Sequence, residues 1–597
     1  MAEKEYIISL KRGVDYEAFD EEMQEGIGRG LIKDRMVDVA NARPLSQRNT
    51  HYMLEEAEVT ELLKDERVLD IEEPPENRDD VQIGTQAVQT GTWRKAASIT
   101  SSDLNWGMLR ATTREDVWGS GVISSTNPFN YNLTGKGVDV VISDSGIDTG
   151  HVEFTDANGV SRVKPIDWFS ASGVAGSQGA NHYRDYDGHG THVASTVAGR
   201  TMGWAKDAHI YAIKVSGLQG SGDNGAISTS NCFDIIKGWH NNKPIDPATG
   251  LKRPTIVNMS WGYTSTLSNT PSGGSFRGTT WTYGNANFSS DNELRDNAGI
   301  MTKIFNSNTN RKIPLRITSV DTDIQELIDA GVHVCISSGN SYYYTAAEND
   351  QDWNNYVTIN GVNYYYHRGG SPYDTEAFMV GSLDITYQGG LEHKSEFSNC
   401  GPGVDMYAPG NNIMGASSDD SSGTNDIVTD GATRVAHPLN ASQWLMKISG
   451  TSMASPNLCG MLATVLEASP DMTPAGLKEW THSNATKDKM YQGTIADWDD
   501  YDSINCGGDS NYQSKAIVTS TEMAPLAKHL DTRGLRLMAW GAKGGASAVT
   551  DTFIQKVART YELLLDPTGT SIDISKQKSA VAGMKQYNVC QFIGHTG

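Results

Sequence analysis

The sequence predicts an α/β fold whose largest domain is built on a mainly parallel sheet. From about residue 103 onward, short apolar stretches alternate with amphipathic helical segments, which is typical of parallel strands joined by helices. The chain has 597 residues, too many for one ordinary domain. Two polar stretches, residues 76–102 and 488–520, therefore divide it into three parts.

The first part, residues 1–75, is predicted to be a small α+β domain. Alternating apolar residues indicate its strands, and acidic amphipathic stretches indicate its helices. In chain order these segments are strand 5–11, helix 14–24, strand 51–54, helix 55–65 and strand 67–72. Residues 76–102 follow as a linker, charged and proline-containing at first and then rich in glycine, threonine and serine.

The central domain spans residues 103–487. Its buried strands are predicted at 138–143, 209–215, 255–261 and 332–338, and its helices at 226–239 and 321–330. Two insertions, residues 263–315 and 341–370, interrupt the alternation. In the second insertion, Asn360-Gly361 between two alternating runs predicts a β-hairpin.

The last part is an acidic linker, residues 488–520, and a small α/β or α+β module of unknown role, residues 521–597. Within it, residues 534–540 indicate a strand and 549–565 an amphipathic helix. GAKGGAS (541–547) lacks the spacing of a phosphate-binding loop and is interpreted as a glycine-rich turn.

Composition excludes several classes of partner. The net charge of −23 argues against nucleic acid, because phosphate binding needs a basic surface. No run of about twenty apolar residues occurs, so no membrane insertion is expected. The first residues lack the layout of a secretory signal, which predicts a protein that is cytoplasmic as synthesised; the alternative is a protein that is virion-associated or released by lysis. The six cysteines form no CxxC pair and are expected to be mostly reduced core residues, with a disulfide or two left open.

The stretch DYDGHGTHVAS (185–195) contains two histidines three residues apart. His189 and His192 have a spacing that a metal ion accepts, but a zinc site requires further ligands nearby. A catalytic base requires instead an orienting carboxylate and a nucleophile. The rest of the chain decides between these two interpretations.

A suitable carboxylate and a suitable hydroxyl are both present. Asp144 follows the predicted strand 138–143, and the carboxyl ends of parallel strands are where such sheets place active residues. Ser452 stands at the start of an apolar helix, with Pro456 expected in the first turn. At that position the backbone N–H and the positive end of the helix favour an oxyanion.

Three short motifs stand along the chain in the order Asp, His, Ser. They are DSGID (144–148), HGTHVA (189–194) and GTSMASP (450–456). Together they resemble the motifs of the subtilisin-like serine proteases, the subtilases. The resemblance implies a three-layer α/β domain and a catalytic triad of Asp144, His189 and Ser452, with His192 as a packing residue.

Further matches extend the resemblance over about residues 103–487. Asn340, in SSGNS after strand 332–338, matches the asparagine that completes the family's oxyanion hole. The direct run from the histidine helix to the next strand, residues 198–215, resembles the proteinase K branch of the family.

Two segments match the walls of the family's substrate cleft, which pairs with an extended peptide backbone. The residues are Ser260, Trp261 and Gly262 on one wall and Gly220, Ser221 and Gly222 on the other. Trp261 is bulkier than the leucine that is common in the family at this position. The tyrosine-rich hairpin in 341–370 either forms the floor or lid of the primary pocket or packs its own tyrosines.

A structural calcium ion is a second implication of the resemblance. Asp405 matches an aspartate that holds a cation in the family, together with main-chain oxygens near Thr375 and Ala377. The acidic run 496–511 lacks the glycine of an EF-hand loop and is interpreted as a solvated loop. No cofactor is implied for catalysis.

The resemblance implies a serine endopeptidase that cleaves protein or peptide substrates through an acyl-enzyme. Residues 1–75 resemble the inhibitory propeptides of the family, which makes this N-terminal domain the expected intramolecular inhibitor; a freestanding binding module is the alternative. The alternative for the whole chain is a structural or assembly component, for example of a virion, with a latent protease domain.

Overall fold

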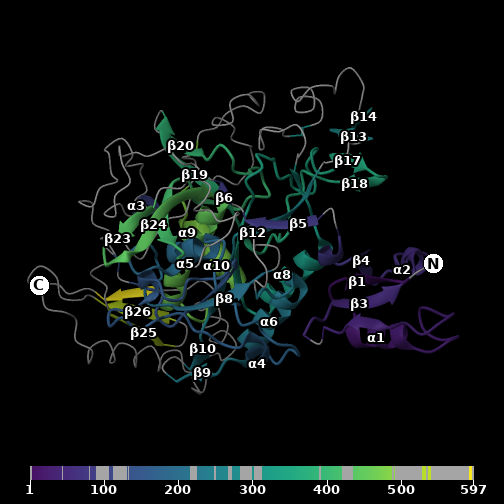
Figure 1. Ribbon diagram of the computed structural model, residues 1–597, viewed down its shortest axis with the longest axis horizontal. Coiled ribbons are helices and arrows are strands. Elements are labelled where there is room, and N and C mark those ends of the chain that lie inside the picture. The colour runs from purple at the N-terminus through teal and green to yellow at the C-terminus, as the bar shows by residue number, and fades with distance from the viewer. Residues whose placement is uncertain are drawn as a thin grey trace, which may run out of the picture.

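The computed structural model shows an N-terminal domain, a large central domain and a short C-terminal sheet in that order along the chain (Figure 1). The described residues are 3–43, 45–78, 81–85, 87–88, 106–111, 131, 133–215, 225–247, 250–266, 272–282, 299–300, 312–388, 391–419, 434–486, 490, 528–532, 535–539 and 590–593. Within them, no helix has the length and apolar character needed to cross a bilayer.

The central domain is built on a mainly parallel sheet, as predicted, and this sheet has seven strands. In spatial order its strands are β20 (Leu391–Lys394), β19 (Phe378–Gln388), β16 (His333–Ser337), β11 (Thr255–Met259), β7 (Asp139–Asp144) and β8 (His209–Lys214), with β21 (Met406–Pro409) also paired to β19. Every pair is parallel except β19 with β20. The four predicted buried strands are therefore confirmed, and all four lie in this sheet.

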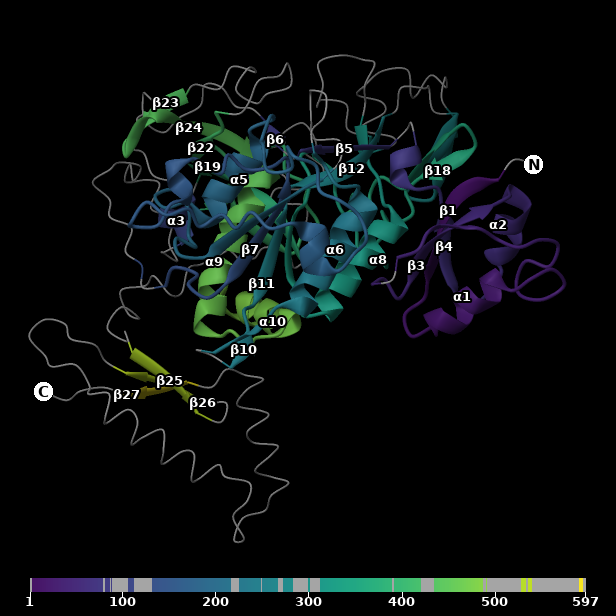
Figure 2. The same cartoon turned by 60° about the horizontal axis from the view of Figure 1, so that its bottom comes forward.

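Helices cover both faces of the sheet, which confirms the three-layer prediction. In Figure 2, α5 (His189–Ala198) and α9 (Thr451–Ala468) lie on one side of β7 and β11, and α6 (Thr229–Asn242) and α8 (Thr318–Asp329) lie on the other. Val140 and Ile142 of β7 pack in the first core, while Val141 packs in the second. Successive residues of a strand point to opposite faces, so a continuous apolar run is what a doubly covered strand requires.

The two insertions pair with each other. They form a four-stranded antiparallel sheet in the order β14 (Thr279–Thr282), β13 (Gly273–Phe276), β17 (Tyr356–Ile359) and β18 (Val362–Tyr364). The predicted hairpin is confirmed, with Asn360 and Gly361 at φ 50° and 84°. This sheet has a core of its own that includes Tyr343 and Tyr366, which favours the interpretation that the insertion packs its own tyrosines.

The N-terminal domain is a four-stranded antiparallel sheet with two helices. Its sheet order is β2 (Val39–Asn41), β3 (Asn49–Leu54), β1 (Lys4–Leu10) and β4 (Val68–Glu72), and its helices are α1 (Tyr16–Gln24) and α2 (Glu56–Leu62). The domain encloses a separate apolar core. It lies against α6 and α8 of the central domain, as both views show (Figures 1 and 2).

Arg43 anchors the N-terminal domain on these two helices. The Arg43 side chain is 1% exposed, and its guanidinium forms ion pairs at 2.9 Å with Asp234 of α6 and with Asp323 of α8. Glu72 of β4 accepts a hydrogen bond from the backbone N–H of Ser319 at the start of α8. The contact between the domains is thus both buried and charged.

The described C-terminal residues form a three-stranded sheet of β25 (Lys528–Thr532), β26 (Leu535–Ala539) and β27 (Cys590–Ile593). β26 confirms the strand predicted at 534–540. The helix predicted at 549–565, the turn at 541–547 and the acidic run at 496–511 lie outside the described residues. Cys232, Cys335 and Cys459 are free and buried, as expected for reduced core cysteines. Cys400 is disulfide-bonded, so the possibility of a disulfide that the sequence left open is realised.

Candidate active site

The end of β7 and the start of α5 bring Asp144 and His189 together. The His189 Nδ1 atom lies 2.8 Å from the Asp144 Oδ1 atom, and both side chains are fully buried. A carboxylate only accepts, so Nδ1 is the protonated nitrogen and the neutral ring has its lone pair on Nε2. This Nε2 atom is buried and has no hydrogen-bond partner among the described residues.

Two glycines permit this contact. A Cβ atom on Gly190 of α5 would overlap the carbonyl oxygen of Gly146, and Gly146 has a φ of 116° that favours glycine. Close backbone packing between α5 and the loop after β7 therefore requires the glycines of HGTHVA and DSGID.

Asp185 ties the same two elements together, a role that sequence reasoning missed. Its carboxylate accepts hydrogen bonds from the Ser145 hydroxyl at 2.8 Å and from the backbone N–H groups of Gly188 and Thr191 at 2.9 and 2.7 Å. Burial raises the pKa of Asp185. The available signal in the sequence was an aspartate four residues before the candidate histidine.

The electrostatics of the site favour a charged imidazole at His189. Burial alone would lower the pKa of His189, but the charge and hydrogen bond of Asp144, with a further contribution from Asp187, raise it above its usual value. Burial in turn raises the pKa of Asp187 to about 7. His192 behaves in the opposite way, because burial lowers its pKa to about 3.

His192 is not part of a metal pair. Its Nε2 atom lies 3.1 Å from the carbonyl oxygen of Ile413 and 3.3 Å from that of Met446, so it serves as a packing and hydrogen-bonding residue. The described residues contain no cluster of three or more His, Cys, Asp or Glu side chains arranged for a metal ion.

Ser452 lies in the first turn of α9, directly beside Ser260. The Ser452 hydroxyl donates to the Ser260 carbonyl oxygen at 3.1 Å, and the Ser260 hydroxyl donates to the Ser452 carbonyl oxygen at 2.9 Å. Pro456 was expected in the first turn but lies one turn further inside α9. Because proline has no N–H to donate four residues back, the Ser452 carbonyl is left free for Ser260.

Asn340 is held by Thr451, the residue before Ser452. Its Oδ1 atom accepts from the Thr451 N–H at 2.9 Å and from the Thr451 hydroxyl at 2.8 Å. Since Oδ1 faces these donors, Nδ2 faces away from them, and it is buried without a partner among the described residues. Asn399 supports this loop by accepting from the backbone N–H groups of Ser341 and Tyr343 at 3.1 and 3.0 Å.

The predicted substrate-binding segment forms β12 (Trp261–Thr266), which pairs with β15 (Lys312–Pro314) on one side and with β5 (Val81–Thr85) on the other. Ser260 precedes β12, and Gly262 pairs with Gly84 of β5, so a peptide backbone already lies along this side of β12. The Trp261 side chain was expected to line the cleft, but it is 1% exposed and its indole N–H donates to the Ser143 carbonyl oxygen at 3.0 Å. The indole therefore packs against the end of β7, and only the backbone of Trp261 is available to pair with a substrate.

The opposite wall of the cleft is not described. The residues predicted for it, Gly220, Ser221 and Gly222, lie outside the described residues. The chain does run directly from α5 to β8, which agrees with the predicted short connection of residues 198–215.

The three residues predicted to hold calcium contact a lysine side chain in this structure. The Lys478 ammonium, on α10 (Pro474–Asn484), lies 3.0 Å from the Asp405 carboxylate and donates to the carbonyl oxygens of Thr375 and Ala377 at 2.7 and 2.6 Å. These are the three oxygens that were expected to bind the ion. A lysine ammonium there supplies the positive charge, so the donor set does not fit calcium.

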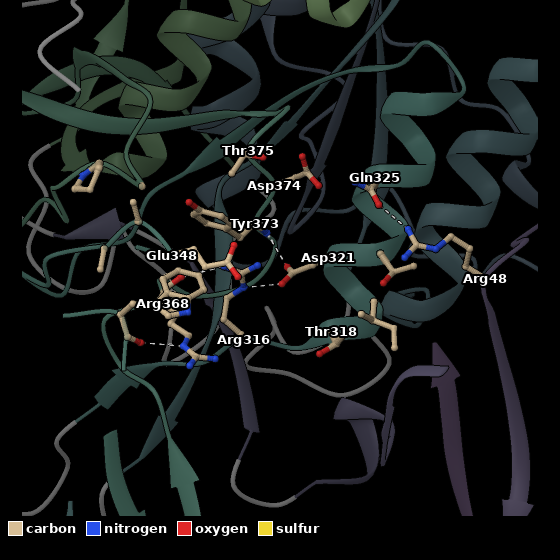
Figure 3. Close-up of a pocket in the computed structure, with 17 residues that line it drawn as sticks. Arg48, Arg316, Thr318, Asp321, Gln325, Glu348, Arg368, Tyr373, Asp374 and Thr375 are labelled. Atoms are coloured by element: carbon tan, nitrogen blue, oxygen red, sulfur yellow. Dashed lines mark hydrogen bonds and ion pairs between the residues drawn. The ribbon is translucent and has the colours of Figure 1, made fainter. Parts of the chain in front are cut away.

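A cavity of about 480 Å³ lies apart from these residues. It is lined by the N-terminal domain, α8 and the second insertion, and none of Asp144, His189, Asn340 and Ser452 borders it. In Figure 3, Arg316 pairs with Asp321 at 2.6 Å and Arg48 donates to Gln325 at 2.6 Å. The cavity therefore belongs to the junction between domains.

Comparison with known proteins identifies the central domain. A model of the subtilase family, Peptidase_S8, matches residues 135–497. A subtilisin-like protease of Arthroderma otae is 23% identical over 468 residues, covering 76% of this chain and 71% of that protein. An extracellular serine proteinase of a Thermus species is 25% identical over 383 residues, covering 64% of this chain and 61% of that protein.

Solved structures of similar proteins include fervidolysin from Fervidobacterium pennivorans, described as a keratinolytic enzyme related to subtilisin. It is 16% identical, with a TM-score of 0.46, and covers 87% of this chain and 60% of that chain. The alternative of a structural or virion component finds no support in these similarities.

Proposed function

The chain belongs to the subtilase family, and from this premise we propose that it is a serine endopeptidase with Asp144, His189 and Ser452 as its triad and Asn340 as its oxyanion donor. The single observation that supports this assignment most directly is the buried His189–Asp144 contact at 2.8 Å. It fixes the tautomer that leaves Nε2 free to take a proton.

The first step is proton removal from Ser452. Its hydroxyl exchanges the bond to the Ser260 carbonyl for one to His189 Nε2, and Oγ then attacks the substrate carbonyl carbon. His189 becomes positively charged, and the Asp144 carboxylate stabilises that charge. The proton next passes from Nε2 to the leaving amine, and water completes hydrolysis of the acyl-enzyme.

The oxyanion formed by this attack meets two donors. One is the Asn340 Nδ2 group, whose buried N–H atoms lack a partner among the described residues. The other is the Ser452 backbone N–H in the first turn of α9, where helical N–H groups have no intrahelical acceptor. Donors that are already oriented act without reorganisation when charge develops.

The substrates are expected to be extended peptide segments. β15 pairs with one edge of β12, and β5 pairs with the other in an antiparallel register, which is the edge expected to pair with a substrate backbone. Because β5 follows the N-terminal domain in the chain, that domain is expected to act as an intramolecular inhibitor that keeps the cleft filled. Its buried Arg43 contacts with α6 and α8 support this assignment.

Hydrolysis of an unfolded protein substrate tests the proposed function. Asp144→Asn should lower kcat by about ten-thousandfold, since the amide favours the wrong imidazole tautomer. Asp70→Asn on β4 is a matched control, because Asp70 contacts Thr318 of α8 and not the triad. Unchanged kcat in Asp144→Asn would reject the triad assignment.

A further inference from the structure

The cavity at the junction of the domains is lined by side chains from distant parts of the chain. Arg48 and Leu69 belong to the N-terminal domain, Gln325 belongs to α8, and Asp374 lies in the loop before β19. The cavity volume of about 480 Å³ is within the range of small-molecule sites, roughly 300–1,000 Å³. The proposed catalytic residues do not border it, so a ligand here is separate from the substrate.

Arg48 is a partly buried cation that forms no ion pair within the part of the chain that the structure describes. Its Nε atom donates to the Leu10 carbonyl oxygen at 2.9 Å, and its Nη1 atom donates to the side-chain oxygen of Gln325 at 2.6 Å. The Arg48 Nη2 group and the Gln325 amide nitrogen have no acceptor among the described residues. Burial lowers the pKa of Arg48, because its positive charge lacks a compensating partner. These N–H groups are suited to bind a carboxylate.

Asp374 is a partly buried anion in the opposite situation. Its Oδ1 atom accepts from the backbone N–H of Glu376 at 2.6 Å. Its Oδ2 atom has no donor, and its carboxylate no paired cation, among the residues that the structure describes. Burial raises the pKa of Asp374, because its negative charge is poorly solvated. The Asp374 carboxylate therefore favours a cationic group that donates hydrogen bonds.

The other charged groups of the lining are compensated in place. Arg316 pairs with Asp321 at 2.6 Å. The Arg368 guanidinium lies 3.8 Å from the centre of the Tyr365 ring, and Glu348 is exposed to water. Within the described lining, this leaves one partly buried cation and one partly buried anion without a charged or aromatic partner.

We propose that this cavity binds the zwitterion of a free α-amino acid with an apolar side chain. The ligand carboxylate accepts hydrogen bonds from Arg48 Nη2 and the Gln325 amide, and the ligand ammonium donates to Asp374 Oδ2. Figure 3 shows Arg48 and Gln325 to the right of Asp321 and Asp374 above it, so the two charges approach the cavity from different sides. The ligand side chain covers Leu69, which is 44% exposed.

The bound amino acid bridges two domains, because Arg48 belongs to the N-terminal domain and Asp374 to the central domain. A ligand that needs both domains in contact strengthens that contact by the same factor by which the contact strengthens its binding. Such a ligand also raises the Tm of the whole chain.

Calorimetric titration of the full chain tests the site, with Ser452→Ala present so that the sample is not hydrolysed. The probe is L-leucine. N-acetyl-L-leucine lacks the ammonium, and L-leucinamide lacks the carboxylate. Leucine should bind with a dissociation constant below about 10 mM and raise the Tm, and each blocked form should bind at least about tenfold more weakly. No leucine binding up to about 10 mM, or equal binding of either blocked form, would overturn the proposal.

Asp374→Asn keeps an acceptor for the Glu376 N–H but removes the charge, so it should weaken leucine binding at least about tenfold. The matched control is Glu376→Gln, which removes the same charge from an exposed side chain that does not line the cavity. Thermal melts without leucine check that both variants fold. Equal leucine affinities of the two variants would overturn the assignment of the ammonium site.

Arg48→Gln tests the other end of the ligand and should also weaken leucine binding at least about tenfold. Its control is Arg12→Gln, at an exposed arginine outside the cavity lining, which should bind leucine as before. Unchanged binding in Arg48→Gln would overturn the carboxylate site. None of these groups belongs to the proposed triad, so a failure of leucine binding leaves the proposed function standing.

Discussion

The side-chain oxygen of Asn340 accepts two hydrogen bonds from Thr451, one from its backbone N–H at 2.9 Å and one from its hydroxyl at 2.8 Å. Thr451 immediately precedes Ser452, so the amide of Asn340 is clamped next to the nucleophile. The clamp fixes which end of the amide is available. Oxygen faces Thr451, and the N–H atoms are left for an oxyanion.

Asn340→Ala is expected to lower kcat about a hundred- to a thousandfold with little change in KM. The Asn340 N–H stabilises negative charge that exists only in the transition state. Its removal should therefore reduce transition-state stabilisation by about 3–4 kcal/mol. Steady-state kinetics with a peptide substrate measure both constants. Asn363→Ala, on the outer hairpin strand β18, is the control and should leave both unchanged. A change confined to KM would make Asn340 a binding residue.

The pH dependence of activity should follow His189. Its neutral form is the base, so kcat/KM falls as the pH falls through the pKa of His189. That pKa is raised from its ordinary value of 6.5, so the acid limb should have its midpoint above about 6.5. Asp187 contributes to raising it, and Asp187→Asn should therefore move the midpoint to lower pH. A midpoint that moves upward in this variant would contradict the electrostatic account.

Lys478 should replace a metal ion in stabilising the turn at Asp405. Lys478→Met leaves the Asp405 carboxylate and two carbonyl oxygens without their shared donor, which should cost about 1–3 kcal/mol of unfolding free energy. Lys64→Met, at a largely exposed side chain, is the control and should have little effect. Thermal melts measure both variants.

The same site predicts the response to chelation. When chelator is added, the Tm of wild type and that of Asp405→Asn should fall by equal amounts, or not at all, because the Lys478 ammonium pairs with Asp405. A chelator effect that is present in wild type and abolished in Asp405→Asn would restore the calcium site.

Arg43 should dominate docking of the N-terminal domain. Arg43→Ala leaves Asp234 and Asp323 buried without their cation, which should cost about 3–5 kcal/mol. This corresponds to a rise on the order of a thousandfold in the inhibition constant of the N-terminal domain, residues 1–75, added to the separate central domain. Arg12→Ala is the matched control. Its pair with Asp329 is about half exposed on both sides, so inhibition should change by less than about tenfold. Equal effects of the two variants would reject the buried anchor.

The central sheet was predictable because its strands are buried on both faces. A strand such as β7 needs apolar residues at successive positions, and that requirement is visible in the sequence as DVVIS. The triad was predictable for a related reason. Gly146 and Gly190 must allow close backbone contact, so the glycines accompany Asp144 and His189 in fixed motifs.

Features that depend on a distant partner were not predictable. β5 and β6 (Ala87–Val88) lie in a polar stretch that was interpreted as linker. They are strands only because β12 and β24 (Asn440–Gly450) pair with them. Lys478 has the appearance of an ordinary helix-surface lysine until the fold brings it to Asp405. The motif around Trp261 predicted a side chain that lines the cleft, but the indole N–H donates instead to the carbonyl oxygen of Ser143 on β7.

Labelling with a fluorophosphonate, followed by peptide mass mapping, tests the nucleophile most directly. The protein should carry one phosphonyl group, on Ser452, and Ser452→Ala should fold normally, remain unlabelled and lose on the order of a millionfold in kcat. Ser455→Ala, a neighbouring serine of α9 that donates to Asn258, should still be labelled at Ser452. Label on any other residue, or peptide hydrolysis by Ser452→Ala above about a hundredth of the wild-type rate, would contradict the account.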